Sequence, residues 1–196
     1  MNFSTGSIHN IRSISQQSLA VYWQKLCGRL QRIPSFQEFQ PGDRIHDPKQ
    51  LAVWKVEQAE EQPTCRALYR GRLLDDAFNN SWIGKTLPEV TPLPLREKIV
   101  GASNECVRTG RPVYMVIRTY DSAEHAVDLE RLLLPFGENG QVRHIVASLQ
   151  LISLEGSFER QTVAQRFEAR ADCVLCISIP LNPLAEKRQS GLERNS

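Results

Sequence analysis

The 196-residue sequence contains no apolar run that approaches the roughly 20 residues of a membrane-spanning helix. Its N-terminus also lacks the basic start and unbroken apolar stretch of a secretory signal. Charge of one sign is scarce, because 24 lysines and arginines nearly balance 22 aspartates and glutamates. The resulting net charge of +2 supplies no basic field of the kind that nucleic-acid-binding proteins use. We therefore expect a cytoplasmic protein with no membrane or nucleic-acid partner.

The motifs of common catalytic and metal sites are missing too. The sequence has no Gly-X-Ser-X-Gly elbow, no His-Glu-X-X-His pair and no complete phosphate-binding loop. Its five cysteines, irregularly spaced, argue against a disulfide framework. Cys173 and Cys176 form a Cys-X-X-Cys, but a structural zinc site needs a second pair of ligands, so we expect no metal. We interpret them as small residues of a half-buried strand, and oxidation to a disulfide is the alternative.

Near the N-terminus, a polar stretch over residues 1–18 without periodicity predicts a flexible leader. A helix is predicted over residues 19–33, because apolar side chains recur there at spacings of three and four. This stripe either packs on the domain's own sheet or pairs with its copy in a dimer. The candidate dimer-interface residues are Leu19, Trp23, Leu26 and Leu30.

The middle of the chain predicts an α+β domain with one five-stranded antiparallel sheet and helices on one face. Helical patterns occur near residues 73–78 and over residues 93–109. The predicted strands are 51–58, 64–70, 113–120, 125–134 and 141–152. In the last strand Ile145 and Leu149 alternate with polar residues, so this face should contact the core.

The C-terminal part predicts an amphipathic helix and a short strand within residues 153–180, followed by a disordered tail over residues 181–196. No output domain is recognisable there. The central domain therefore spans residues 19–152, and any signal should leave it by contact with a partner protein or in a homodimer.

Several short motifs follow one another in the order found in PAS domains. They are Tyr22-Trp23 with Gly28-Arg29 and Pro34-Ser35, Gly71 and Phe78 with Gly84-Lys85-Thr86-Leu87 before Glu89-Val90, Thr109-Gly110-Arg111-Pro112-Val113, and Glu130-Arg131-Leu132-Leu133-Leu134-Pro135 followed by Gly140 and Val142. The chain thus resembles the small single-domain PAS proteins of alphaproteobacteria over roughly residues 19–152. Two positions depart from that pattern: Asn79 stands where a glycine is usual, and Leu68 where an arginine is frequent.

The resemblance implies a ligand site between the sheet and the helices that cross it. With Leu68 in place of an arginine, such a cavity would be more apolar than in relatives. The alternative is that the same side chains simply fill the core. The candidate pocket residues are Trp54, Phe78, Trp82, Leu87, Ile99, Cys106, Ile145 and Leu149.

The cofactor is unknown from the sequence. Haem is unlikely, because an axial histidine should lie on a helix facing the cavity, whereas the four histidines fall in loops, strands or the leader. Covalent flavin is also unlikely, because the reactive-cysteine motif of flavin photosensors is missing around residues 79–87.

We therefore expect a sensory or protein-interaction module of PAS type, and not an enzyme. One rival is a small α+β enzyme with Asp128, Glu130 or His144 inside its cavity. The carboxylates Asp128 and Glu130 share a strand face, but a solvated cross-strand ion pair with Arg118 or Arg131 is the simpler interpretation. The other rival is a purely structural dimerisation domain with a solidly packed interior.

Overall fold

The computed structural model describes residues 3–42, 47–58, 62–77, 81–121, 123–153, 156 and 171–181. His46, Phe78 and the predicted C-terminal helix lie outside this part, as does almost all of the predicted tail. The strands are β1 (Ser4–Thr5), β2 (Leu51–Glu57), β3 (Thr64–Arg70), β4 (Val113–Tyr120), β5 (Ala126–Glu138), β6 (Gln141–Ser153) and β7 (Asp172–Ser178). The α-helices are α1 (Ile14–Leu30), α2 (Arg72–Ala77), α3 (Leu87–Val90) and α4 (Leu93–Thr109), with 3-10 turns η1 (Ile8–Asn10), η2 (Phe36–Glu38) and η3 (Pro48–Gln50).

The fold is α+β in class, as predicted. Its sheet, however, has seven strands in the described part of the chain rather than the predicted five. Its order is β1-β7-β4-β5-β6-β2-β3. The five predicted strands pair antiparallel with one another in one continuous block. β7 extends the block antiparallel to β4, and β1 pairs parallel with β7, which makes the sheet mixed. The sequence prediction was wrong here because β1 is too short to show periodicity and β7 is far from β4 along the chain.

The N-terminal helix begins earlier than predicted. Ser13 is its N-cap, and the Ser13 side chain accepts a hydrogen bond from the Gln16 backbone N–H. The helix ends at Leu30, where the C-cap Gln31 has a φ of 54°. Residues 3–18 therefore contribute β1, η1 and the first helical turn to the fold, in place of the predicted leader.

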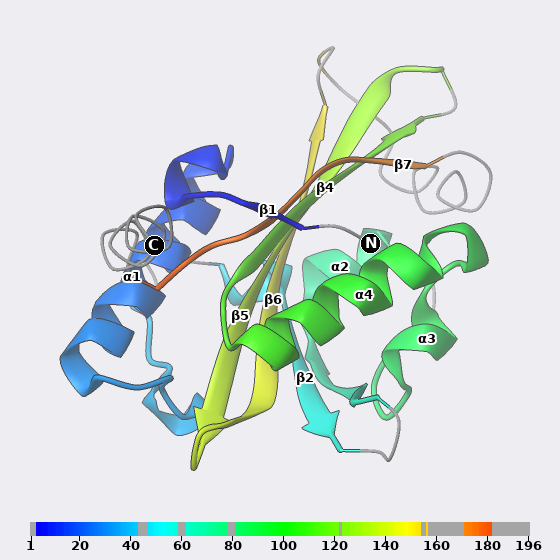
Figure 1. The fold of residues 1–196 in the computed structure, drawn as a ribbon. Coiled ribbons are helices and arrows are strands. Elements are labelled where there is room, and N and C mark those ends of the chain that lie inside the picture. Colours follow the sequence, from blue (N-terminus) through cyan, green and yellow to red (C-terminus); the bar gives the residue numbers. More distant parts are fainter. Residues whose placement is uncertain are drawn as a thin grey trace, which may run out of the picture.

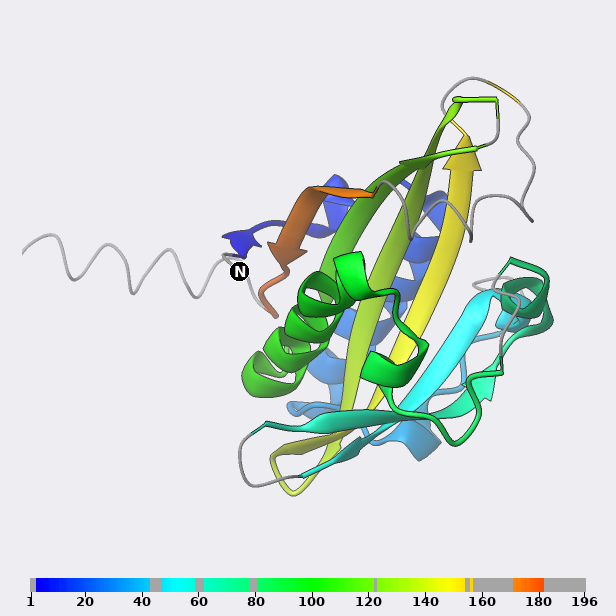
Figure 2. The ribbon, with the colours of Figure 1, turned by 90° about the vertical axis from the view of Figure 1, so that its right-hand side faces the viewer.

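Helices cover both faces of the sheet (Figures 1 and 2). α1 crosses one face, and α2, α3 and α4 lie on the other. Leu19 and Trp23 of α1 are 1% and 0% exposed and pack with sheet residues, and Leu26 is also buried. The stripe thus packs on the chain's own sheet, which is the first of the two predicted alternatives. Leu19, Trp23 and Leu26 are therefore not available to a dimer interface, and Leu30 is half-buried. Strand β4 carries apolar side chains on both of its faces, because helices cover both faces of the sheet.

A tight turn joins strands β5 and β6, which are neighbours in the sheet. Asn139 and Gly140 have φ values of 52° and 77° and form the two-residue turn between β5 and β6, a pair typical of tight hairpins. β5 therefore continues four residues beyond its predicted end at Leu134. Among the described helices, none is long and apolar enough to cross a membrane.

Candidate functional site

A small cavity of about 40 Å³ lies between the sheet and the helices α3 and α4. It is lined by side chains from strands β2, β5 and β6, from helices α3 and α4, and from the loops flanking α3. The lining residues are Trp54, Trp82, Leu87, Val90, Thr91, Pro92, Ile99, Arg131 and Leu149. Its position is the one that the sequence predicts for a ligand.

Five of the eight predicted pocket residues line this cavity together. They are Trp54, Trp82, Leu87, Ile99 and Leu149. Cys106 and Ile145 are 0% and 1% exposed and belong to the same core cluster, but they do not line the cavity. Phe78 lies outside the described residues.

Two tryptophans form one wall. The Trp54 and Trp82 rings lie 5.7 Å apart at 36°, and the Arg70 guanidinium lies 5.0 Å above the Trp82 ring. The loop after Trp82 is tied to strand β3 by two backbone hydrogen bonds between Ala67 and residues Gly84 and Lys85, of 3.0 and 2.9 Å. Gly84 in this loop has a left-handed conformation, with φ of 77°, which glycine adopts without strain. Trp82 is therefore held in place through both its ring and its backbone.

Helix α3 and the segment after it form a second wall. The Thr86 backbone N–H and hydroxyl both donate to the Glu89 carboxylate at 2.6 Å, which forms a capping box at the helix start. The Thr91 hydroxyl donates to the Leu87 carbonyl at 2.7 Å. Residues 90–92 also line an outer cleft of about 500 Å³ on the surface. A single short segment thus separates the buried cavity from this cleft.

Arg131 is the charged group of the site. It lies on β5 between Leu129 and Leu133, whose side chains face the same core cluster, and it is 3% exposed. Its strand neighbours are Met115 on β4 and Leu149 on β6. Its Nη1 atom is buried without a hydrogen-bond partner among the described residues. An uncompensated buried cation is costly, so this arrangement requires an explanation.

The titratable groups that affect the pKa of Arg131 are thiols. Burial lowers the pKa of Arg131 to about 10, and the nearby cysteines Cys65, Cys176 and Cys106 oppose this shift. Burial raises the pKa of Cys65 to about 11 and that of Cys106 well above its ordinary value. At neutral pH Arg131 is therefore a cation, whereas Cys65 and Cys106 are neutral and do not balance its charge.

A second polar atom at the cavity also lacks a partner. Trp54 is 2% exposed, and no described group accepts a hydrogen bond from its Nε1. Trp54 and Arg131 both line the cavity. The site therefore combines apolar walls with two buried donors that have no described acceptor.

Arg131 was not among the predicted pocket residues, although the alternation of side chains along β5 indicates that it faces the core. Side chains alternate along a strand, so Arg131 must face the opposite side from Asp128 and Glu130. Its place between Leu129 and Leu133 marks it as an inward-facing arginine. The predicted cross-strand pair instead forms with Arg118, whose Nε lies 2.8 Å from Asp128 Oδ1. Asp128 is 1% exposed, so this ion pair is buried on the Asp128 side rather than solvated.

The candidate acid/base groups lie on the α1 face. Arg12 Nη1 lies 2.7 Å from Asp128 Oδ2, and the Ser13 backbone N–H donates to Glu130 Oε2 at 3.1 Å. Burial raises the pKa of Glu130, and hydrogen bonds from Tyr114 and Ser13 oppose that shift. These carboxylates therefore anchor the start of α1 and do not reach the cavity.

The histidines that the structure describes also lie away from the cavity. His144 stacks on Phe36 at 5.1 Å on the α1 face. The His125 ring lies 3.2 Å from Asp121 Oδ2 in the turn before β5. Within the described part of the chain, no group of three or more metal-ligating side chains is present.

Cys173 and Cys176 lie on β7, in the half-buried strand that the sequence predicts. The register shift opposite Val116 and Ile117 lets both pack against the cavity-side core although they are three residues apart. A hydrogen bond from the Cys176 thiol is the main cause that lowers the pKa of Cys173 to about 7.

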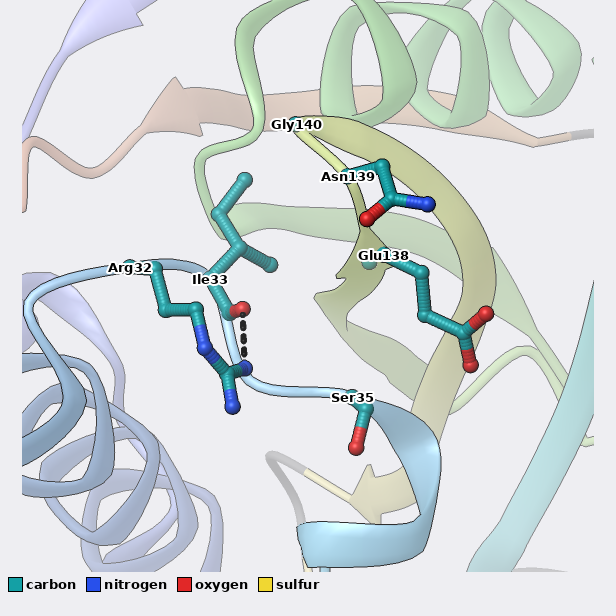
Figure 3. Close-up of a pocket in the computed structure, with 7 residues that line it drawn as sticks. Arg32, Ile33, Ser35, Glu138, Asn139 and Gly140 are labelled. Carbon is teal, nitrogen blue, oxygen red and sulfur yellow. Dashed lines mark hydrogen bonds between the residues drawn. The ribbon is translucent and has the colours of Figure 1, made fainter.

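A larger cleft of about 410 Å³ lies between the end of α1 and the β5–β6 turn (Figure 3). Its cation, Arg32, is already paired with Glu38 Oε1 at 2.7 Å and with the Ile33 carbonyl at 3.1 Å. Ser35 donates its backbone N–H to the same Glu38 carboxylate at 2.7 Å. Because its cation is already paired with a carboxylate, this cleft is a weaker candidate for a binding site than the cavity beside α3 and α4.

Comparison with known proteins leaves the family open. No family model matches the chain, and no curated protein matches it. Among solved structures, an RNA-binding light-oxygen-voltage receptor matches with a TM-score of 0.37 and 14% sequence identity. The match covers 83% of this chain and 42% of that chain, so this chain spans less than half of the receptor's length. At that TM-score the likeness carries no argument about fold or function.

Proposed function

We propose that this protein is a sensory module of PAS type that binds a small molecule in the cavity between the sheet and helices α3 and α4. The observation that carries the proposal is the cavity between the sheet and helices α3 and α4, whose walls are mainly apolar and include two buried donors without a described acceptor. A domain that serves only as structural support gains nothing from leaving Arg131 and Trp54 unpaired. A binding site does, because the ligand supplies the missing acceptors.

The arrangement of elements supports the PAS assignment. Five consecutive antiparallel strands carry short helices and the longer α4 on one face, as the sequence resemblance implies. The departure at Leu68 is compensated from another strand. Leu68 is 47% exposed and points away from the core, whereas Arg131 supplies a cation to the cavity. The cavity thus combines mainly apolar walls with one cation that comes from β5 and not from the position of Leu68.

We propose binding rather than catalysis. The groups named as candidate acids and bases lie on the α1 face, where they hold α1 to the sheet. Among the described residues that line the cavity, Arg131 is the only titratable side chain. A guanidinium is a poor acid or base at neutral pH, so it is suited to recognition.

Signal transmission would follow from the position of the site. The cavity contacts α4 through Ile99 and the connecting segment through residues 90–92. A ligand that binds one arrangement of these elements better than another shifts the population toward it. The exposed side of α4 or the β7 edge would then present a changed surface to a partner protein or a second copy.

Native mass spectrometry of the purified full-length chain tests this function. We expect a bound small molecule, and the same spectrum reports the subunit count. Trp82→Ala should reduce retention of that molecule, because Trp82 forms one cavity wall. Ile83→Ala is the matched control, because Ile83 is 55% exposed and does not line the cavity. Equal retention in both variants would place the ligand elsewhere and remove the support for the proposed site.

A further inference from the structure

The chemistry of the cavity also restricts the ligand class, and this step rests on the proposed function. Arg131 brings one positive charge to a cavity whose other described lining residues are uncharged. Among the described residues no carboxylate lies within ion-pair distance of it, since the buried carboxylates Asp128 and Glu130 face the other side of the sheet. The site is therefore complementary to a negative charge.

Size sets the second restriction. The cavity of about 40 Å³ compares with the roughly 10–15 Å³ of free volume that a single water requires. It therefore holds about three to four non-hydrogen atoms. A carboxylate group has three such atoms and acetate has four, so acetate fits whole and propionate, with five, is the upper limit of size. A larger ligand would need residues 90–92 to move toward the outer cleft.

Charge sets the third restriction. A guanidinium presents parallel N–H donors that match the two oxygens of a carboxylate. A phosphate dianion has the same kind of oxygens but carries up to two charges, and Arg131 is the one cation among the described lining residues. The second negative charge would remain uncompensated between Ile99, Leu87 and Leu149. A monoanion is thus favoured over phosphate.

We infer that the cavity binds the carboxylate group of a small monoanionic organic acid, which accepts hydrogen bonds from the Arg131 guanidinium and the Trp54 indole N–H. Both donors lie within one cavity and lack any described acceptor. The apolar walls contact the short carbon chain of the acid. Neutral amides of the same shape lack the charge and should bind poorly.

Thermal unfolding and titration calorimetry of the full chain with acetate and propionate test the inference, with acetamide, propionamide, phosphate and matched sodium chloride as comparisons. We expect the two carboxylates to raise the unfolding temperature in a saturable way, because ligands that bind the native state stabilise it. The amides, phosphate and chloride should not do so.

Three variants locate the effect. Arg131→Met should weaken propionate binding at least 100-fold, and Arg131→Lys should restore part of it through the retained charge. Trp54→Phe retains a six-membered aromatic ring but removes the pyrrole ring with its N–H. It should therefore weaken propionate binding about 5- to 10-fold. Arg108→Met is the matched control, because Arg108 on α4 is 72% exposed and should leave binding unchanged.

The outcomes separate this inference from the proposed function. Equal stabilisation by propionate and propionamide, or propionate binding that survives Arg131→Met, would overturn the anion inference. A retained neutral molecule that depends on Trp82 but not on Arg131 would overturn it as well and leave the proposed site intact. No retained molecule in native mass spectrometry, together with no response to carboxylates, would remove both.

Discussion

The two faces of the sheet differ in how they treat buried charge. On the α1 face, Asp128 has two arginine partners, and Glu130 accepts a hydrogen bond from the Ser13 backbone. On the α4 face, Arg131 is buried with its Nη1 unpartnered among the described residues. The same strand, β5, supplies all three of these charged residues. The carboxylates on the α1 face are thus paired and attach the start of α1 to the sheet. On the α4 face, a buried donor has no described acceptor.

The α1 face also fills its space. Trp23 is fully buried, and its Nε1 donates to the Pro135 carbonyl at 2.8 Å. Gln16 bridges to the sheet by donating to the Ser148 carbonyl at 2.9 Å, although its Oε1 has no hydrogen-bond partner in the described part of the chain. The α4 face instead encloses a cavity. Most buried polar groups named on the α1 face are thus paired, whereas the α4 face holds the cavity with its two donors that lack a described acceptor.

The largest expected effect comes from breaking the packed face. Trp23→Ala should lower the free energy of unfolding by about 3–5 kcal/mol, because it opens a large cavity and removes a buried hydrogen bond. Val21→Ala, on the exposed side of the same helix, should change it by less than about 0.5 kcal/mol. Urea unfolding followed by far-UV circular dichroism measures both. A loss of less than about 1 kcal/mol for Trp23→Ala would show that α1 does not pack as described.

The two β-strand arginines should respond with opposite signs. Arg131→Met removes an unpaired buried cation and should raise the free energy of unfolding of the ligand-free protein by about 1–2 kcal/mol. Arg118→Met deprives the buried Asp128 of one of two partners and should lower it by a similar amount, about 1–2 kcal/mol. The same urea titrations measure this pair. Destabilisation by Arg131→Met would mean that the guanidinium already has a compensating partner in the free protein.

The smallest expected effect concerns the alkylation rates of two thiols, one from each face of the sheet. A hydrogen bond from Cys176 lowers the pKa of Cys173 to about 7, and burial raises that of Cys27 to about 12. Since the thiolate is the reactive form and a lowered pKa yields it at lower pH, Cys173 alkylation should rise with a midpoint near pH 7. Cys27 should remain unreactive up to at least pH 9. Iodoacetamide labelling with peptide mass spectrometry measures both rates.

A matched variant sharpens the thiol comparison. Cys176→Ala removes the hydrogen-bond donor, so the Cys173 midpoint should move upward toward the ordinary thiol value of 9.0. An unchanged midpoint would show that Cys176 does not set the reactivity of Cys173. Equal rates for Cys173 and Cys27 would remove the distinction between the faces.

Local patterns predicted much of this fold. The helix Leu93–Thr109 and the strands Thr64–Arg70 and Val113–Tyr120 have the bounds that the sequence predicts. Apolar periodicity and the Gly110-Arg111-Pro112 turn carry that information within a few residues. The same patterns brought five pocket residues together, because inward-facing aromatic and aliphatic side chains identify the core.

The errors arise where distant segments meet. The alternation of β7 could be recognised, but its position beside β4 depends on contacts across more than 50 residues. The stripe of α1 was equally suited to a sheet or to a second helix, since both partners offer an apolar surface. Only the packed chain shows that Leu19 and Trp23 face the sheet.

The sequence by itself determined the α+β class, the five central strands and the apolar character of the cavity wall, because these follow from the period of hydrophobic residues along single segments. Tertiary structure decided how β1 and β7 extend the sheet, the role of α1 and the isolation of Arg131. Whether a buried charge is compensated depends on groups brought from other strands and helices, and no local pattern records their distance.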